Sequence, residues 1–114
     1  MKLGWEASGK NDLKRVVELT DECVKLYGEE AKKQQASLSG FPVSGQEKSY
    51  QALNDVATIY FIQGEILMNN GKAVEAQAVF QKTIDEYKWA QAWDPSRGSF
   101  WSVAEKSQAS IDVL

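Results

Sequence analysis

The chain has 114 residues, enough for one domain, and its 43% hydrophobic and 25% charged residues are typical of folded rather than disordered proteins. It has no histidine and a single cysteine, Cys23, which excludes His-based catalytic triads, His-ligated metals, Cys-cluster zinc sites and intrachain disulfides. Its 13 Lys and Arg and 16 Asp and Glu are interspersed, so no basic stripe is available to bind nucleic acid.

Apolar and small side chains recur at intervals of three and four over residues 12–38, which predicts a long first helix. Asp12 is suited to cap its N-terminus. Gly28 falls inside the pattern, but strong helix formers follow it, so we expect the helix to continue through Gly28, with or without a bend. Cys23 lies on the apolar stripe and is expected to be a core residue. Residues 39–45 are rich in Ser, Gly and Pro and predict a loop.

The same periodicity predicts a second helix over residues 46–69 and a third over residues 72–88. Asn69, Asn70 and Gly71 lie where a helix is expected to stop, because Asn and Gly tolerate left-handed backbone conformations.

The C-terminal quarter is less regular. Residues 89–98 predict an irregular segment with a turn at 94–97, and residues 99–113 predict a last helix. Ser102 and Glu105 match a capping box, so this helix has an alternative start at Ser102. No segment alternates with a period of two over enough length for a strand, and we therefore expect a single all-α domain over residues 1–114 whose last helix caps the others.

The chain repeats itself when it is shifted by 60 residues. The shift places Val16 on Ala76, Cys23 on Thr83 and Tyr27 on Tyr87. A helix-turn-helix unit therefore occurs twice, over about residues 4–38 and 46–88.

Residues 60–67 of the second unit hold aromatic, glycine and leucine residues at fixed spacing, and residues 76–80 begin with alanine and end with phenylalanine. In these two segments the unit resembles a tetratricopeptide repeat, with departures at Gln63, Thr83 and Lys88. The resemblance implies antiparallel helical hairpins of the right-handed α-α superhelix type. Gly64 and Ala76 are then small because two helices cross closely there. The residues that fill the space around the crossing are Tyr60, Leu67 and Phe80.

The resemblance also implies a non-enzymatic module that binds a protein or peptide in a groove lined by the first helix of each repeat, without a cofactor. The groove residues implied by position are Thr58, Phe61, Glu65, Met68 and Asn69, with Trp5 and Ser8 as counterparts in the first unit. Two repeats are too few to bury a continuous core. The alternative is that the long first helix, the last helix or a second chain covers this face.

Four large aromatic residues gather near the C-terminus, at Trp89, Trp93, Phe100 and Trp101. They are expected either to anchor the loop and the last helix on the core or to form a hot spot for protein or a stacking platform for glycan. This tail resembles the end of small repeat-like modules of bacterial proteins, some described as glucanase precursors. Three hypotheses follow: an interaction module, a homodimer that buries Phe61 and Met68, or an accessory glycan-binding domain.

No catalytic or metal-binding set is expected. The adjacent carboxylates at 29–30 and at 85–86 point about 100° apart on a helix and do not form facing pairs. No apolar stretch approaches the roughly 20 residues of a membrane span. Residues 1–6 lack the apolar segment of a signal peptide, so we expect a cytoplasmic protein, or a periplasmic or envelope one if the chain is a processed fragment.

Overall fold

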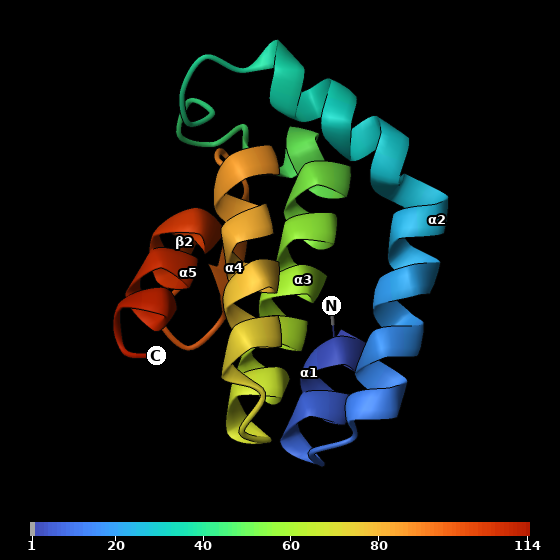
Figure 1. Ribbon diagram of the computed structural model, residues 1–114. Helices are drawn as coiled ribbons and strands as arrows, with labels where there is room; N and C mark the ends of the chain where they lie inside the picture. Colours follow the sequence, from blue (N-terminus) through green and yellow to red (C-terminus); the bar gives the residue numbers. More distant parts are fainter. Residues whose placement is uncertain (1) are drawn as a thin grey trace.

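A computed structural model describes residues 2–114, which form five α-helices, a short 3₁₀-helix and a two-stranded sheet (Figure 1). The helices are α1 (Lys2–Gly9), α2 (Leu13–Ser37), α3 (Gln51–Asn69), α4 (Ala73–Glu86) and α5 (Val103–Asp112). The 3₁₀-helix is Glu47–Tyr50, and the strands are β1 (Gln91–Asp94) and β2 (Ser99–Ser102). The chain is therefore mostly helical, as predicted, and the strand pair is the exception.

Helix α2 follows the sequence prediction closely. Asp12 caps it, because its Oδ1 accepts a hydrogen bond from the backbone N–H of Arg15 at 3.1 Å. The helix continues through Gly28, and Figure 1 shows its C-terminal part passing over the start of α3. There Gln34 accepts a hydrogen bond from the backbone N–H of Leu53 at 2.8 Å, and Gln35 accepts one from that of Trp89 at 3.0 Å. The end of α2 is thereby tied to the beginning of α3 and the end of the second hairpin.

Helix α1 is not predicted by the periodicity, because its 8 residues are too few to give a clear pattern. A turn at Asn11, whose φ is 55°, returns the chain into α2. Helices α1 and α2 form a first hairpin, and α3 and α4 form a second one through a turn at Gly71, whose φ is 75°. Helix α3 is the central element, and most of its side chains are buried.

Helices α3 and α4 are in close contact at Gly64. A Cβ atom at this position would lie 2.6 Å from Cε1 of Phe80, so nothing larger than glycine fits without a shift of that ring. Leu67, Ala76 and Phe80 are buried, and Tyr60 stacks on Tyr87 with ring centroids 5.9 Å apart. The residues of the predicted crossing therefore lie in the interface between these two helices or beside it.

The segment after α4 differs from the prediction. Residues 91–94 and 99–102 pair as antiparallel strands, with Gln91 opposite Ser102 and Trp93 opposite Phe100. The turn predicted at 94–97 lies in the connection between them, where the N–H of Gly98 donates to the carbonyl of Asp94 at 2.8 Å. The predicted helix start at Ser99 is wrong, since cross-strand hydrogen bonds use the backbone of residues 99–102.

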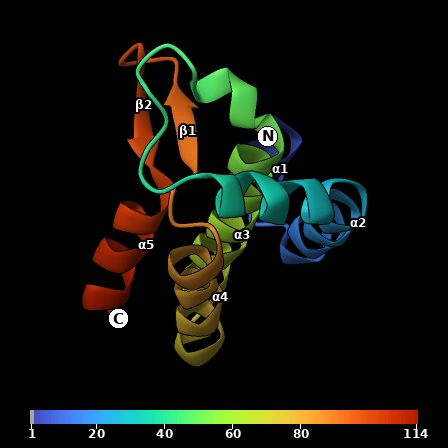
Figure 2. The same ribbon diagram turned by 90° about the horizontal axis from the view of Figure 1, so that it is seen from above.

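Helix α5 begins at Val103, and Ser102 caps it by accepting a hydrogen bond from the N–H of Glu105 at 3.2 Å. This is the alternative start that the capping box predicts. Thr83 of α4 and Ser107 of α5, both fully buried, share a hydrogen bond of 2.6 Å. Seen from above, α2 and α5 lie at opposite sides of the molecule with α3 and α4 between them (Figure 2). Within residues 2–114, every helix is too short or too polar to cross a membrane.

Candidate functional site

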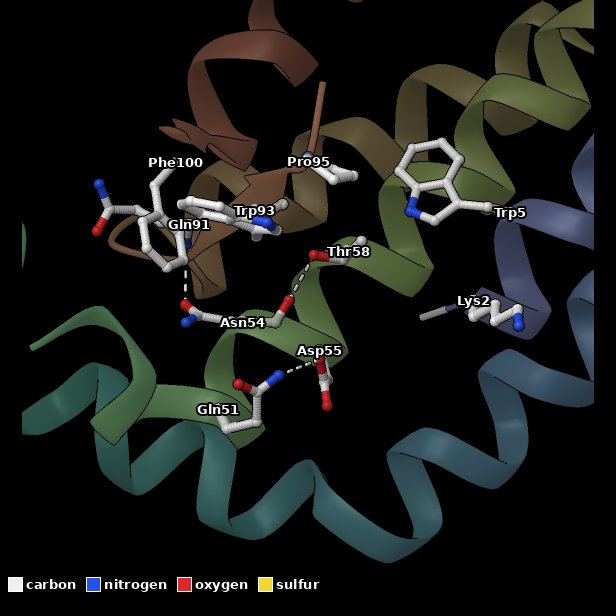
Figure 3. A pocket seen from close by; sticks show the side chains of 11 residues that line it. Lys2, Trp5, Gln51, Asn54, Asp55, Thr58, Gln91, Trp93, Pro95 and Phe100 are labelled. Carbon is white, nitrogen blue, oxygen red and sulfur yellow. Dashed lines mark hydrogen bonds between the residues drawn. The ribbon is translucent and has the colours of Figure 1, made fainter. Parts of the chain in front are cut away.

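A cleft of about 280 Å³ opens between α1, the first half of α3 and the strand pair (Figure 3). Trp5 of α1, 41% exposed, forms one wall, and Trp93 of β1, 53% exposed, forms the other together with Phe100 and Pro95. Lys2 lies at the edge. Polar side chains of α3 and β1 line the rest of the cleft, at Gln51, Asn54, Asp55, Thr58 and Gln91.

Both tryptophans are held by a neighbouring ring. Trp93 and Phe100 are opposite each other in the strand pair, and their rings meet edge to face with centroids 5.1 Å apart. Trp5 meets the ring of Phe61 edge to face at 6.4 Å. In Figure 3 the two indole nitrogens are turned toward the space between the rings, and no hydrogen bond joins either of them to the other residues drawn. The cleft therefore presents two apolar rings and two N–H donors on fixed walls.

Asn54 joins the floor of the cleft to the strand pair. Its Nδ2 donates to the carbonyl of Glu47 at 2.9 Å, and its Oδ1 accepts from the backbone N–H of Gln91 at 2.9 Å. Thr58 donates to the carbonyl of Asn54 at 2.6 Å. Because the amide of Asn54 is already bonded at both ends, its role is to position β1, and hence Trp93, against α3.

The remaining polar groups of the cleft have unused bonding capacity. Asp55 accepts a hydrogen bond from Nε2 of Gln51 at 2.6 Å, and its second carboxylate oxygen accepts none from another side chain of residues 2–114. The Oε1 of Gln91 has no hydrogen-bond partner within residues 2–114 either, but it is buried and its amide points away from the space between the two indoles, so it is not offered to a ligand (Figure 3). Asp55 and Lys2 do not form an ion pair with each other in that part of the chain. A ligand with both donors and acceptors could therefore bond to the floor and the edge.

The groove predicted along α3 is closed at its centre. Phe61, expected to be exposed there, is buried, because the rings of Trp5, Phe80 and Trp101 surround it with centroids 5.3 to 6.4 Å away. Thr58 does line the cleft, but its side chain is buried as well. Helix α1 and strand β2 cover this face, so an open groove over Phe61 is wrong, and so is a homodimer that buries Phe61.

The other residues predicted for the groove lie outside the cleft. Glu65 is half-buried, and burial raises the pKa of its carboxyl while Lys106 of α5 counteracts the rise. Met68 packs against the core, Asn69 is exposed at the end of α3, and Ser8 is half-buried on α1.

The predicted aromatic cluster is divided between three places. Trp89 packs edge to face on Phe41, with centroids 5.0 Å apart, and Trp101 packs on Phe61. Only Trp93 and Phe100 reach the cleft. The tryptophans of the cluster therefore do not form a shared platform, and Trp89 and Trp101 anchor the C-terminal segment to the rest of the molecule.

Comparison of the chain with protein-family models, with curated proteins and with solved structures found no match in any of the three. The cleft itself is thus the observation that bears on function. Its chemistry is that of binding: two indoles, amide side chains, one carboxylate and one ammonium group suit stacking and hydrogen bonding with a ligand.

Proposed function

We propose that the chain is a non-enzymatic, tetratricopeptide-like interaction module that binds an extended segment of a protein partner in the cleft between Trp5 and Trp93. The observation that carries this proposal is the presence of two half-exposed indoles on opposite walls of one cleft above a polar floor. Exposed tryptophans fixed by their neighbours are frequent anchors in protein interfaces, since they bury a large area at a small cost in entropy.

The groups around the cleft fit the backbone of an extended peptide. Such a segment carries unpaired N–H and C=O groups, which must be bonded when the peptide is desolvated. The indole N–H groups and Lys2 can donate to its carbonyls, while Asp55 can accept from its N–H groups. The volume of about 280 Å³ is slightly below the usual range for ligand sites, so the cleft would hold a few residues and leave the rest on the surface.

The arrangement of the helices supports the tetratricopeptide-like part of the proposal. Two helical hairpins follow each other along the chain, and α1 and α3, the first helices of the two, both contribute to the cleft. In a tetratricopeptide array the binding groove is likewise formed by the first helix of each repeat. The strand pair and α5 would then take the place of a third repeat.

A peptide library displayed against the full chain tests the proposal, followed by titration of a selected peptide against variants. We expect Trp93→Ala and Trp5→Ala each to weaken binding by about 30-fold, as is typical of interface hot spots. Phe41→Ala is the matched control, because Phe41 is an exposed aromatic outside the cleft. Selection of no peptide, or of peptides that bind both tryptophan variants as well as the unaltered chain, would contradict the proposal.

An oligosaccharide is the alternative ligand, because sugar sites also combine aromatic rings with amide and carboxylate side chains. Figure 3 shows Trp5 nearly face-on and Trp93 nearly edge-on, and rings at such different inclinations do not form one flat platform. Titration of soluble oligosaccharides against the same variants separates the two ligands. Binding of a sugar that depends on Trp93, without binding of any peptide, would replace the peptide by a glycan.

A further inference from the structure

A second hollow, of about 410 Å³, lies between α1 and α2, away from Trp5. Leu3 of α1 is 59% exposed beside it, and Leu26 and Tyr27 of α2 are 62% and 48% exposed. Leu19, partly buried, continues the apolar surface along α2. Contiguous exposed apolar surface of this kind marks an interaction site more often than scattered single side chains do.

The exposed face of α2 has a regular pattern. Residues three or four apart lie on one side of a helix. The residues of this face, here called the α2 stripe, are Arg15, Leu19, Glu22, Leu26 and Glu30. All of them except Leu19 are exposed. The stripe carries a cation near one end, an anion at the other end and two leucines between them.

This pattern is complementary to itself when it is reversed. If two copies of α2 run antiparallel with their two-fold axis between positions 22 and 23, Leu19 of each copy faces Leu26 of the other. The same axis places Arg15 of each copy opposite Glu30 of the other. A parallel pair would instead bring Arg15 to Arg15 and Glu30 to Glu30, which repel each other.

We propose that the α2 stripe binds the α2 stripe of a second copy of this chain, in an antiparallel, two-fold symmetric pair. The leucines form the seam, as in antiparallel helix packing, and Leu3 of α1 covers one flank of it. Arg15, which is paired with Glu18 at 3.4 Å within the chain, gains Glu30 of the other copy. The α2 stripe is separate from Trp93 and the floor of the cleft. Dimerisation can therefore be tested independently of peptide binding.

Near the axis the pair has one unfavourable contact. Glu22 of each copy lies next to the two-fold axis and therefore close to Glu22 of the other copy. Like charges at short distance weaken association. Glu22→Gln is therefore expected to strengthen the pair, a result that an unrelated interface would not produce.

Sedimentation of the full chain over a range of concentrations tests the proposal by charge reversal. The unaltered chain is expected to dimerise, and Arg15→Glu or Glu30→Arg alone is expected to weaken dimerisation by roughly tenfold, because each substitution removes two pairs related by symmetry. The double variant Arg15→Glu with Glu30→Arg should restore it. Leu26→Glu should abolish the dimer without unfolding the chain, since Leu26 is mostly exposed, and circular dichroism checks this.

Cross-linking locates the axis. In a Cys23→Ala background, Glu22→Cys should form a disulfide-linked dimer under mild oxidation, whereas Glu18→Cys, one turn away, should not. An unaltered chain that stays monomeric at the highest concentration reached would overturn the proposal. So would a dimer that survives Leu26→Glu, or one that the double charge reversal fails to restore, because either would place the interface elsewhere.

Discussion

Helices α2 and α4 are the second helices of the two hairpins, and the same position on each has a different environment. Tyr27 and Tyr87 coincide when the chain is shifted by 60 residues, yet Tyr27 is 48% exposed and Tyr87 only 1%. Tyr87 packs against Tyr60 of the preceding helix and lies near Cys23 of α2. Helix α1, the first helix of the other hairpin, has only 8 residues against 19 in α3, and within residues 2–114 no aromatic ring packs on Tyr27. A repeated pattern thus defines an apolar face, and the length of the neighbouring helix decides how much of that face is covered.

The largest expected effect on the free energy of unfolding is at these tyrosines, Tyr27 in α2 and Tyr87 at the C-cap of α4. Tyr87→Ala should lower the free energy of unfolding by about 3–5 kcal/mol, as is usual for a large buried aromatic residue. Tyr27→Ala should change it by less than about 0.5 kcal/mol. Urea denaturation at a low protein concentration, at which a dimer would dissociate, measures both. Equal effects would show that the two positions are equally buried in solution.

The two hairpins also differ in the space around a glycine of each, Gly64 on α3 and Gly28 on α2. Gly64→Ala should destabilise the chain by about 1–3 kcal/mol, because the new Cβ lies 2.6 Å from the Phe80 ring. Gly28→Ala on α2 meets only Cγ1 of Val24, at 3.3 Å, and gains helix propensity of up to about 1 kcal/mol. Thermal unfolding compares the two variants. Phe80→Leu is itself expected to destabilise this core, but combined with Gly64→Ala it should cost less than the sum of the two single variants, and strict additivity would argue against a clash with this ring.

The hydrogen bond between Thr83 of α4 and Ser107 of α5 is expected to contribute to the stability of the chain. Thr83→Val leaves the buried hydroxyl of Ser107 without this partner and should lower the free energy of unfolding by about 1–3 kcal/mol, whereas Ser107→Ala should cost less, because Thr83 still donates to the carbonyl of Phe80 at 2.7 Å. The double variant should cost less than the sum of the two, because neither hydroxyl is then left behind. A double-mutant cycle by urea denaturation gives the coupling. Strict additivity would mean that the bond is not formed.

Buried titratable groups predict a loss of stability at alkaline pH. Burial raises the pKa of the Cys23 thiol from 9.0 to about 11 and that of the Tyr87 phenol from 10.0 to about 12. Both groups bind their proton more tightly in the folded state, so their contribution is complete below pH 9 and is lost as the pH rises from 9 to about 12. Cys23→Ala should remove the part of this loss that occurs between pH 9 and about 11, and Tyr87→Phe the part between pH 10 and about 12. Unfolding curves at successive pH values that are identical for both variants and the unaltered chain would contradict this.

The helices α2, α3 and α4 could be predicted from the sequence, because each has enough residues to show its period and recognisable residues at its ends, such as Asp12 and Gly71. The strand pair could not, since each strand has only four residues. In β1, buried Ala92 and exposed Trp93 are one step of an alternation that is too short to detect.

The cleft could be predicted only in part. Trp5 and Thr58 were expected in a groove and do line the cleft, whereas for Trp93 and Phe100 a binding surface was one of two alternatives, beside that of anchoring the C-terminal segment. Phe61 was misplaced, because an apolar residue on a helix does not reveal which element will cover it. A signal for the floor was nevertheless present, as a polar stripe at helical spacing on the otherwise apolar α3. Its members are Gln51, Asn54, Asp55 and Thr58.

The hydrogen bonds of Gln34 and Gln35 at the end of α2 bear on how the chain folds during synthesis. Gln34 accepts its bond from a backbone N–H 19 positions later in the chain, and Gln35 accepts one from a backbone N–H 54 positions later. These two bonds therefore cannot form while the first hairpin alone has been synthesised. A nascent chain that stalls before Trp89 lacks at least one of them, so we expect proteases to cut the end of α2 faster in that chain than in the released one.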